Sequence, residues 1–457
     1  MTSKNPAGSW RSRQWGMLFA LLIVGVAAAY WVLRPPANVE TRQAALRVAL
    51  FKAPASDAVE QLLPEFERLS GVKVELETLP YGELLDKTQT EFLAKSPTYD
   101  VIMADCIWIP KFARAGYLRP IDAFLRDPSL TPADYQPEDI IPSVGDYLGK
   151  FPKNGISYGF PFMTNSHVLA YRRDLYEKEL APKGIREPGR TVETAWTWDE
   201  YLAAAKILTT QDSASPTGKR WGSSMQAKAG AWIVYEWYSW LFGFGGRDID
   251  YATMTPAFTE PGSVEAIRRY SSMVGAVAPA SVTSWGHEEE TQALASGEVA
   301  MDATSNVELA AYLTDASRSK FASQIAFAVS PVSPGKAPTP DMGGYGLLLS
   351  NFSKNPSAAY QFMSWVTSPS VHRRIVLAGG TPFRFSEMRD PEILARYPVY
   401  EIYDEALANS VYRMRVPNWP EIEDIISKEL TRAITKEATA EEAGAAMQSQ
   451  VSAVLKR

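Results

Sequence analysis

Short apolar runs alternate with amphipathic stretches along most of this chain. The run LRVALF is apolar and partly β-branched, which predicts a buried strand at residues 46–51. Apolar positions at helical spacing follow over residues 56–71, with Gly71 as a stop signal. The pattern then continues with a strand at 72–79, a helix at 81–95 and a strand at 99–105. This β-α-β-α-β order is typical of a parallel sheet with helices on both faces.

The same alternation recurs farther along the chain. Strand-then-helix patterns are expected at residues 166–180, 297–315 and 343–369, and a further strand at 325–332. A helix at 197–209 starts with Thr197 followed three residues later by Glu200, the signature of a capping box. From Pro420 onward the chain is expected to be helical and polar. No sequence period of a repeat array is visible.

The N-terminus has the pattern of a membrane-targeting element. Residues 15–33 are nineteen uncharged residues, which as a helix would span roughly 28 Å, close to the hydrocarbon thickness of a bilayer. Arg11 and Arg13 precede this run and orient the leading side toward the cytoplasm. Two interpretations remain open: a signal peptide cleaved near the small residues 27–29, or an uncleaved anchor with Trp31 at the interface. Either one exports the rest of the chain, and residues 1–45 are excluded from the fold as this element plus a polar linker.

Composition narrows the function. The chain has 457 residues, which suggests two domains or lobes. Its net charge is −6 and no basic block stands out, so nucleic acid is not an expected partner. Cys106 is the single cysteine, and the three histidines lie far apart without metal-ligand spacing, so we expect no metal and no cofactor. The unusual features are thirteen tryptophans and the aromatic stretch YEWYSWLFGFGG at residues 235–246.

Eight ordered segments resemble one known family. Each is a weak signal alone, but their common order is a strong one. They are YDVIMADCIWIPKFARAGYLRPID, ISYGFPFMTNSHVLAYRRDLYEK, TWDEYLAAAKILT, the glycine pair after the aromatic stretch, ALASGEVAMDATSN, GGYGLLLSNFSKNPSAAYQFMSWVTSP, AGGTPFRFS and VPNWPE. The chain resembles the extracellular solute-binding proteins of ABC importers, in the carbohydrate-binding family that includes the maltose-binding protein.

The resemblance implies an α/β, two-lobed periplasmic-binding-protein fold of type II. In this fold, crossing hinge strands join the lobes and the ligand lies in the cleft between them. Carried over, the first lobe would comprise residues 46–161 and 287–334, and the second lobe residues 162–286 and 335–457.

The implied function is that of a periplasmic, non-enzymatic receptor, which we expect to be a monomer. It would bind a sugar, sugar alcohol or small glycoside and deliver it to the permease subunits of an ABC transporter. Two alternatives are an exported carbohydrate-active hydrolase, for which Asp105 would have to pair with Glu236 or Glu288, and a membrane-tethered carbohydrate sensor. A hydrolase needs two carboxylates across a sugar, and the sequence indicates no such pairing.

Sugars present flat C–H faces and hydroxyl rims, so a sugar site needs aromatic rings together with polar side chains. Several candidates follow predicted strands, at the strand ends where open α/β sheets bind ligands. Others match cleft positions of the family. The predicted ligand-binding residues are Lys52, Tyr81, Asp105, Trp108, Asn165, Tyr235, Trp237, Tyr238, Trp285, Asn306, Gly344, Tyr345, Arg384 and Trp419. In the aromatic stretch, one face of the helix is expected to meet the cleft and the other to pack inward.

Overall fold

A computed structural model describes residues 45–457, except for residues 133, 153–154 and 335–339. The predicted membrane-targeting segment at 15–33 lies outside the described residues. Among the residues that are described, no helix is both long and apolar enough to cross a membrane.

A seven-stranded mixed sheet organises residues 46–457. Its strand order is β11-β6-β13-β3-β1-β2, and β12 also pairs with β6. The strands are β1 (Leu46–Phe51), β2 (Val74–Leu79), β3 (Val101–Asp105), β6 (Gly159–Arg172), β11 (Met301–Asn306), β12 (Ile325–Ala328) and β13 (Met342–Leu349). β1 runs parallel to both β2 and β3, which confirms the β-α-β-α-β unit expected from the sequence.

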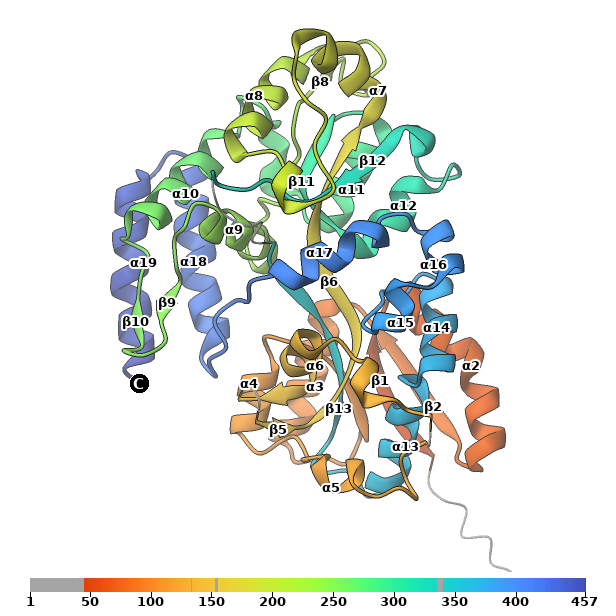
Figure 1. Cartoon of the computed structure of the whole chain (residues 1–457). Coiled ribbons are helices and arrows are strands. Elements are labelled where there is room, and N and C mark those ends of the chain that lie inside the picture. Colours follow the sequence, from red (N-terminus) through yellow and green to blue (C-terminus); the bar gives the residue numbers. More distant parts are fainter. Residues whose placement is uncertain (1–44, 133, 153–154, 335–339) are drawn as a thin grey trace, which may run out of the picture. The chain divides into compact units, whose positions relative to one another are not determined.

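The long strand β6 belongs to both lobes of the fold. Its first half pairs with β13, which in turn pairs with β3. Its second half pairs with β11 and β12. Figure 1 shows β6 and β13 running between a lower group of elements and an upper group, so the two-lobed α/β fold with crossing strands is confirmed.

Helices cover the sheet in each lobe. The first lobe carries α2 (Pro54–Ser70), α3 (Tyr81–Leu93), α4 (Ile109–Arg114), α5 (Asp122–Leu125), α6 (Pro142–Gly149) and α13 (Pro356–Val366). The second lobe carries α7 (Arg173–Leu175), α8 (Trp198–Leu208), α9 (Ala231–Gly243), α10 (Pro261–Ser272), α11 (His287–Ser296) and α12 (Ala310–Thr314). Along one side of the body run α14 (Pro369–Leu377), α15 (Phe385–Met388), α16 (Pro391–Arg396) and α17 (Tyr400–Asn409).

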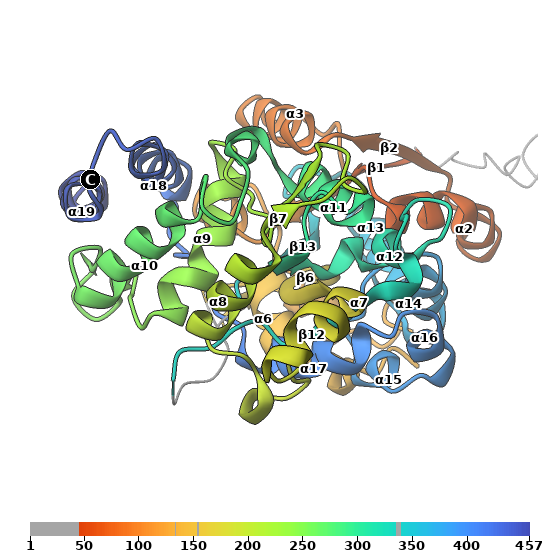
Figure 2. The same cartoon turned by 90° about the horizontal axis from the view of Figure 1, so that it is seen from above.

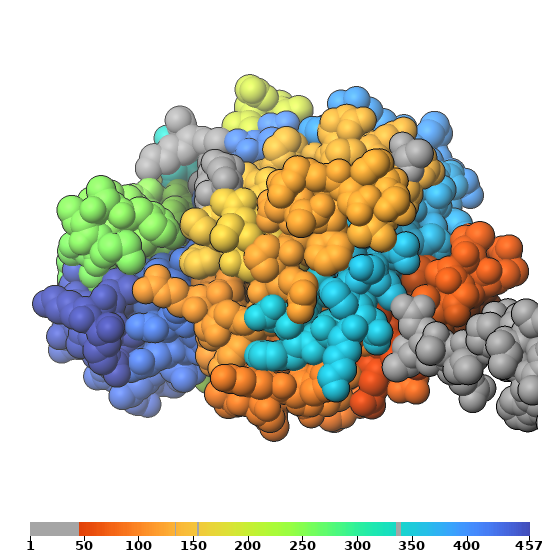
Figure 3. Space-filling view, turned by 90° about the horizontal axis from the view of Figure 1, so that it is seen from below, coloured from red at the N-terminus to blue at the C-terminus, as the bar shows by residue number. Residues whose placement is uncertain are grey.

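The C-terminal helices α18 (Trp419–Ile434) and α19 (Ala440–Leu455) complete the second lobe. They pack against each other and against α10, and α18 also contacts α9. Figures 1 and 2 show these four helices side by side from two directions. Seen from below, α18 and α19 lie next to the residues near 250, at one side of the first lobe (Figure 3). Residues from Pro420 onward are therefore helical, as predicted.

The strand pairing differs from the division into lobes that we expected. Residues 301–306 and 325–328, expected in the first lobe, pair with the second half of β6. Residues 342–349, expected in the second lobe, pair with β3 of the first. The chain therefore leaves the first lobe along β6, which pairs with β13 in its first half and with β11 and β12 in its second half, and returns to the first lobe along β13.

Local sequence signals determine where several helices begin or end. The backbone N–H of Glu200 donates to the Thr197 hydroxyl (3.2 Å), and the N–H of Thr197 donates to the Glu200 carboxylate (2.7 Å), so the predicted capping box is present. Gly71 ends α2 in the left-handed conformation, with φ of 71°. Gly297, expected to begin a strand, instead ends α11 with φ of 85°, and β11 starts four residues later.

The core is built on both faces of the sheet. In β1, Leu46, Val48 and Leu50 belong to a cluster on one face, together with Leu347 of β13. Ala49 points to the other face, where a larger cluster extends into the second lobe. This alternation is the period-two pattern of a strand that is covered on both sides.

The close approach of β6 and β13 generates a stability prediction. A Cβ atom at Gly159 would lie 1.9 Å from the carbonyl oxygen of Leu347. We expect Gly159→Ala to lower the free energy of unfolding by about 1–3 kcal/mol, because the two strands must separate to admit the methyl group. Denaturant unfolding measures this change.

The matched control is Gly82→Ala near the start of α3, where no atom lies within 4 Å of the added Cβ. This control should leave stability unchanged or raise it slightly. Equal destabilisation by both substitutions would contradict the importance of this strand contact.

Candidate functional site

A small cavity of about 30 Å³ lies where the two lobes meet. Its lining comes from α3, the end of β3, β13, the middle of β6, α9, α11 and the segment before α18. The lining residues are Tyr81, Asp105, Asn165, Ala231, Trp232, Tyr235, His287, Gly343, Gly344, Tyr345 and Arg413. A wider opening of about 540 Å³ shares Tyr81, Trp232 and His287 with it and also includes Lys52 and Glu308.

The first lobe contributes the carboxylate of Asp105, which lies among aromatic side chains. Asp105 ends β3 and accepts a hydrogen bond from the Tyr81 hydroxyl (2.9 Å) and one from the backbone N–H of Ile107 (3.2 Å). Tyr345 lies opposite Asp105 in the β3–β13 pairing, and its ring stacks on Phe51 with centroids 5.1 Å apart. These contacts orient the rings of Tyr81 and Tyr345 and leave the Asp105 carboxylate between them.

The second lobe contributes the facing wall. Trp232 and Tyr235 lie one turn apart on α9, so they project from the same face of that helix. The Trp232 ring packs edge-on against the imidazole of His287 at 4.1 Å, and it approaches the Tyr81 ring of the first lobe at 6.1 Å. The cavity is therefore bounded by aromatic surfaces from both lobes.

A chain of side-chain hydrogen bonds crosses the base of the cavity. The Asn165 amide on β6 donates to the side-chain oxygen of Asn306 at the end of β11 (3.0 Å). Asn306 in turn lies within hydrogen-bond distance of His287 Nδ1, whose other ring nitrogen is 3.7 Å from the Glu308 carboxylate. Burial, reinforced by the charge of Arg413, lowers the pKa of His287 to about 3. Because the ring is neutral, Nδ1 can accept the proton of the Asn306 amide.

Arg413 is the buried cation of the site. Its Nε lies 2.9 Å from the Asp341 carboxylate, both side chains being almost inaccessible, and its guanidinium carbon lies 4.8 Å from the centre of the Tyr235 ring. Glu423 lies at 4.0 Å from the same guanidinium. Burial raises the pKa of Asp341, whereas the positive charge of Arg413 lowers it. Burial also raises the pKa of Glu423, to about 7. Asp341, the ion-pair partner of the guanidinium, is not part of the cavity lining.

Two uncharged lining groups have no partner within the described part of the protein, whereas Arg413 Nε, also without a hydrogen bond, has its ion pair with Asp341. The Asn165 side-chain oxygen and the Tyr235 hydroxyl are buried and form no hydrogen bond to any described residue. A buried polar group without a partner is costly, on the order of 1–3 kcal/mol. Both groups face the same small cavity, so a ligand rich in hydroxyl groups would satisfy them.

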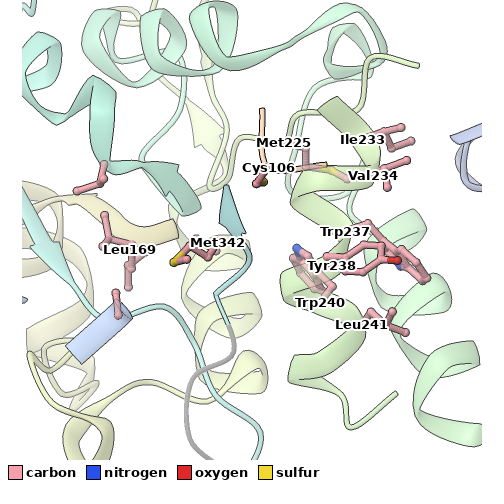
Figure 4. Close-up of a cluster of buried hydrophobic side chains, with 14 of the residues drawn as sticks. Cys106, Leu169, Met225, Ile233, Val234, Trp237, Tyr238, Trp240, Leu241 and Met342 are labelled. Atoms are coloured by element: carbon pink, nitrogen blue, oxygen red, sulfur yellow. The ribbon is translucent and has the colours of Figure 1, made fainter. Parts of the chain in front are cut away.

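Other predicted site residues lie elsewhere in the structure. Trp237, Tyr238 and Trp419 are fully buried in the second-lobe core, and Figure 4 shows Trp237 and Tyr238 among the buried side chains of α9. The Tyr238 hydroxyl donates to Asp248 (3.2 Å), and the Tyr238 and Trp419 rings pack edge to face. The helix is buried nearly all round: of the three residues predicted on it, Tyr235 lines the cavity together with Trp232, whereas Trp237 and Tyr238 pack in the core.

Three further predicted site residues contact other parts of the protein interior and do not line a cavity. Arg384 is fully buried, and its guanidinium donates to the carbonyl oxygens of Thr367 (2.7 Å) and Gln136 (3.0 Å). Trp108 packs behind Tyr81 at 5.0 Å. Trp285 is buried, and its carbonyl accepts the N–H of Lys228. Neither cavity is lined by these three side chains.

Sequence reasoning missed the cavity residues Ala231 and Gly343 and four residues with functional side chains: Trp232, His287, Glu308 and Arg413. A signal existed for Trp232, since it lies three residues before Tyr235 on the same helix. His287 follows the predicted Trp285 by two residues. Nothing in the local pattern around Glu308 or Arg413 indicates a cleft position.

The carboxylate pairs considered for a hydrolase are not assembled at the small cavity. Glu236 is a buried residue of α9 and accepts hydrogen bonds from Tyr270 and Thr304 of the same lobe, both at 2.9 Å. Glu288 lines the wider opening, whereas Asp105 lines the small cavity. No observation therefore favours paired-carboxylate chemistry.

Comparison with known sequences identifies the family to which the protein belongs. Residues 50–372 match the profile of the family described as bacterial extracellular solute-binding protein. This match covers more than half of the chain, and the chain belongs to that family. Members are substrate-binding components of ABC transporters.

Individual relatives refine this picture. The mannitol-binding protein of Pseudomonas aeruginosa is 23% identical over 393 residues, which are 82% of this chain and 84% of the relative. A solved structure of an ABC transporter solute-binding protein from Agrobacterium radiobacter K84 with ribitol has a TM-score of 0.79 at 24% identity, covering 90% of this chain and 99% of that one. Maltose-bound T. maritima MalE3 has a TM-score of 0.76 at 22% identity, covering 90% of this chain and all of that one. These structures establish the shared fold.

The buried ion pair beside the cavity generates the next prediction. We expect Arg413→Leu to destabilise the protein by about 3–5 kcal/mol, because it leaves the Asp341 carboxyl buried without its cation. Adding Asp341→Asn to this variant should restore part of the loss. Thermal and denaturant unfolding measure both effects.

Arg247→Leu is the comparison for this prediction, since Arg247 and Glu260 form an ion pair in which both side chains are substantially exposed. That substitution should cost less than about 1 kcal/mol. If Arg413→Leu lowers the free energy of unfolding as little as Arg247→Leu does, the buried ion pair is not needed for folding.

Proposed function

We propose that this protein is a periplasmic receptor that binds a sugar, sugar alcohol or small glycoside between its lobes and delivers it unchanged to the permease of an ABC importer. The observation that carries the proposal is the small cavity, in which unpartnered hydrogen-bonding groups of Asn165 and Tyr235 lie beside aromatic rings from both lobes. Hydroxyl-rich molecules with flat apolar faces match both features.

The relatives support the same ligand class. Of the relatives named above, one is a mannitol-binding protein and two are structures with bound ribitol and maltose; mannitol and ribitol are linear polyols. In the proposed site, Asp105 and Asn165 would accept ligand hydroxyl protons, Arg413 would donate to ligand oxygens, and Trp232 and Tyr345 would cover C–H surfaces. Gly343 and Gly344 allow the β13 backbone to approach the ligand closely. Lys52 and the wider opening would contact any part of the ligand that extends beyond the small cavity.

Closure of the lobes would complete the binding site. A ligand in the cleft would contact α3 and β13 on one side and α9 and α11 on the other, so binding would favour the closed arrangement over an open one. The closed shape would then be recognised by the permease. The protein would act as a monomer in the periplasm after export, with residues 15–33 serving as signal peptide or inner-membrane anchor.

A panel of sugars and polyols containing mannitol, ribitol and maltose tests the proposal by isothermal calorimetry. We expect at least one member to bind with a Kd near the micromolar range, about −8 kcal/mol. We expect Trp232→Ala to weaken that binding by roughly thirtyfold, or about 2 kcal/mol, because the ligand loses an aromatic wall.

The matched control is Trp237→Phe on the same helix, since Trp237 is buried in the core and does not line the cavity. This substitution should reduce stability but leave the Kd within a factor of about two of the wild-type value. A complete absence of binding across the panel would refute the proposed ligand class, and equal effects of both substitutions would refute the site.

A further inference from the structure

The small cavity does not have room for a whole sugar. Its volume of about 30 Å³ admits on the order of two groups of the size of a water molecule. The wider opening, at about 540 Å³, lies within the size range of pockets that hold small organic ligands, roughly 300–1,000 Å³. The two spaces adjoin, because both are lined by Tyr81, Trp232 and His287. A ligand that reaches the small cavity with one end therefore holds most of its body in the wider opening.

Apolar side chains from both lobes form walls of the wider opening. The first lobe supplies Phe51 at the end of β1, Pro80 before α3 and Met163 in the first half of β6. The second lobe supplies Trp232 of α9 and Leu309, which follows β11. A group that lies between these walls would contact aromatic and aliphatic surface on both sides, so the opening suits an apolar group better than a ring of hydroxyls.

Trp232 and Leu309 keep apolar surface outside the core of the protein. Both side chains are only partly buried. Neither is among the described residues that form the apolar core clusters or pack against them, whereas Val307 and Ala310, on either side of Leu309, belong to the core. Large apolar side chains that line a concave opening in place of joining the core are typical of a binding site for an apolar group.

The charged side chains of the wider opening do not favour a charged ligand. Four of them are exposed to solvent, two cations and two anions: Lys52, Lys228, Glu288 and Glu289. Their charges sum to zero, and water and salt screen exposed charges. The rim of the opening therefore admits an uncharged molecule without preferring an acid or an amine.

Glu308 marks the polar end of the wider opening. Its Oε1 lies 3.7 Å from His287 Nε2, and His287 lines both spaces. Its Oε2 is buried and forms no hydrogen bond to any described residue. A ligand hydroxyl beside His287 would supply the missing donor. Acceptors for hydroxyl groups thus lie toward the small cavity, and apolar surface lies farther out.

We propose that the ligand is a glycoside whose non-sugar part, the aglycone, is apolar and uncharged. Its hydroxylated end enters the small cavity, and its aglycone lies between Phe51, Trp232 and Leu309 in the wider opening. The order of the two parts follows from the unpartnered polar groups of Asn165 and Tyr235 inside and the apolar walls outside. This proposal rests on the proposed function and narrows its ligand class, because it places such a glycoside above a free sugar or sugar alcohol.

Isothermal calorimetry with matched ligands tests this inference. The probes are D-glucose, D-galactose and D-mannose, the phenyl glycoside of each, and maltose, mannitol and ribitol. We expect at least one phenyl glycoside to bind roughly tenfold or more tightly than its parent sugar, because the phenyl ring and the apolar walls are both removed from water. Maltose should gain less over glucose than phenyl glucoside does, because its second ring places hydroxyl groups against apolar walls.

Substitutions in the two spaces should affect the probes differently. Leu309→Asn should weaken binding of the phenyl glycoside roughly fivefold and change binding of the parent sugar by less than about a factor of two, since only the aglycone contacts this side chain. Tyr235→Phe removes the unpartnered hydroxyl of the small cavity, so it should weaken sugar and glycoside by the same factor, about tenfold. The matched control is Leu69→Asn, because Leu69 is an exposed leucine of α2 that lines neither space.

The outcomes separate this inference from the proposed function. If a free sugar, a polyol or maltose binds at least as tightly as every phenyl glycoside, the inference is overturned while the proposed receptor function stands. Equal effects of Leu309→Asn and Leu69→Asn on the phenyl glycoside would overturn it as well, because the aglycone would then lie elsewhere. If no probe binds at all, the proposed ligand class fails and this inference fails with it.

Discussion

The antiparallel contact between β6 and β13 is the constraint on which the cavity depends. Its register places Gly343 opposite Asn165 and Tyr345 opposite Met163, while the β3–β13 register places Tyr345 opposite Asp105. Four cavity residues from three strands, Asp105, Asn165, Gly343 and Tyr345, are thereby fixed within three successive positions of β13. Gly344 makes the contact possible, because it has φ of 132° and a Cβ there would lie 2.4 Å from the carbonyl oxygen of Met163.

The chemistry of the site depends on which buried polar side chains bond to one another and which face the cavity. The hydrogen-bonded series from Asn165 through Asn306 to His287 links a crossing strand to the second-lobe helix α11. The charge of Arg413 is balanced by Asp341 outside the cavity lining. The polar side chains that line the cavity are one carboxylate, one amide, three phenols, a neutral imidazole and the paired guanidinium of Arg413. Such a set suits an uncharged guest with many hydroxyl groups better than a strongly anionic one.

Much of the fold could be read from local patterns. The first parallel unit, the stop at Gly71 and the capping box at Thr197 depend on residues close in sequence, and each was predicted. The assignment of β11, β12 and β13 to lobes was not, because strand partners are set by contacts between distant segments. Periodicity specifies which faces of a strand are buried, but not which strand lies beside it.

The candidate site was predictable to a similar degree. Tyr81, Asp105, Asn165, Tyr235, Gly344 and Tyr345 were expected in the cleft and do line the small cavity. Aromatic rings surround the helix α9, so its sequence carries little indication of which face is inward. Arg413 was missed because it lies in an irregular segment, where a buried ion pair leaves no periodic trace. Burial of a charge can be recognised only when its counter-charge, here Asp341, is seen beside it in space.

The placement of the last two helices has a consequence for how the protein is made. Because α18 packs on α9 and α19 packs on α18 and α10, the hydrophobic surfaces around the aromatic helix stay uncovered until the final segment has been synthesised and exported. The first lobe can assemble its parallel unit early, whereas the second lobe must wait for the C-terminus. A chain without α18 and α19 would therefore leave part of the surface of the tryptophan-rich helix α9 and of α10 uncovered.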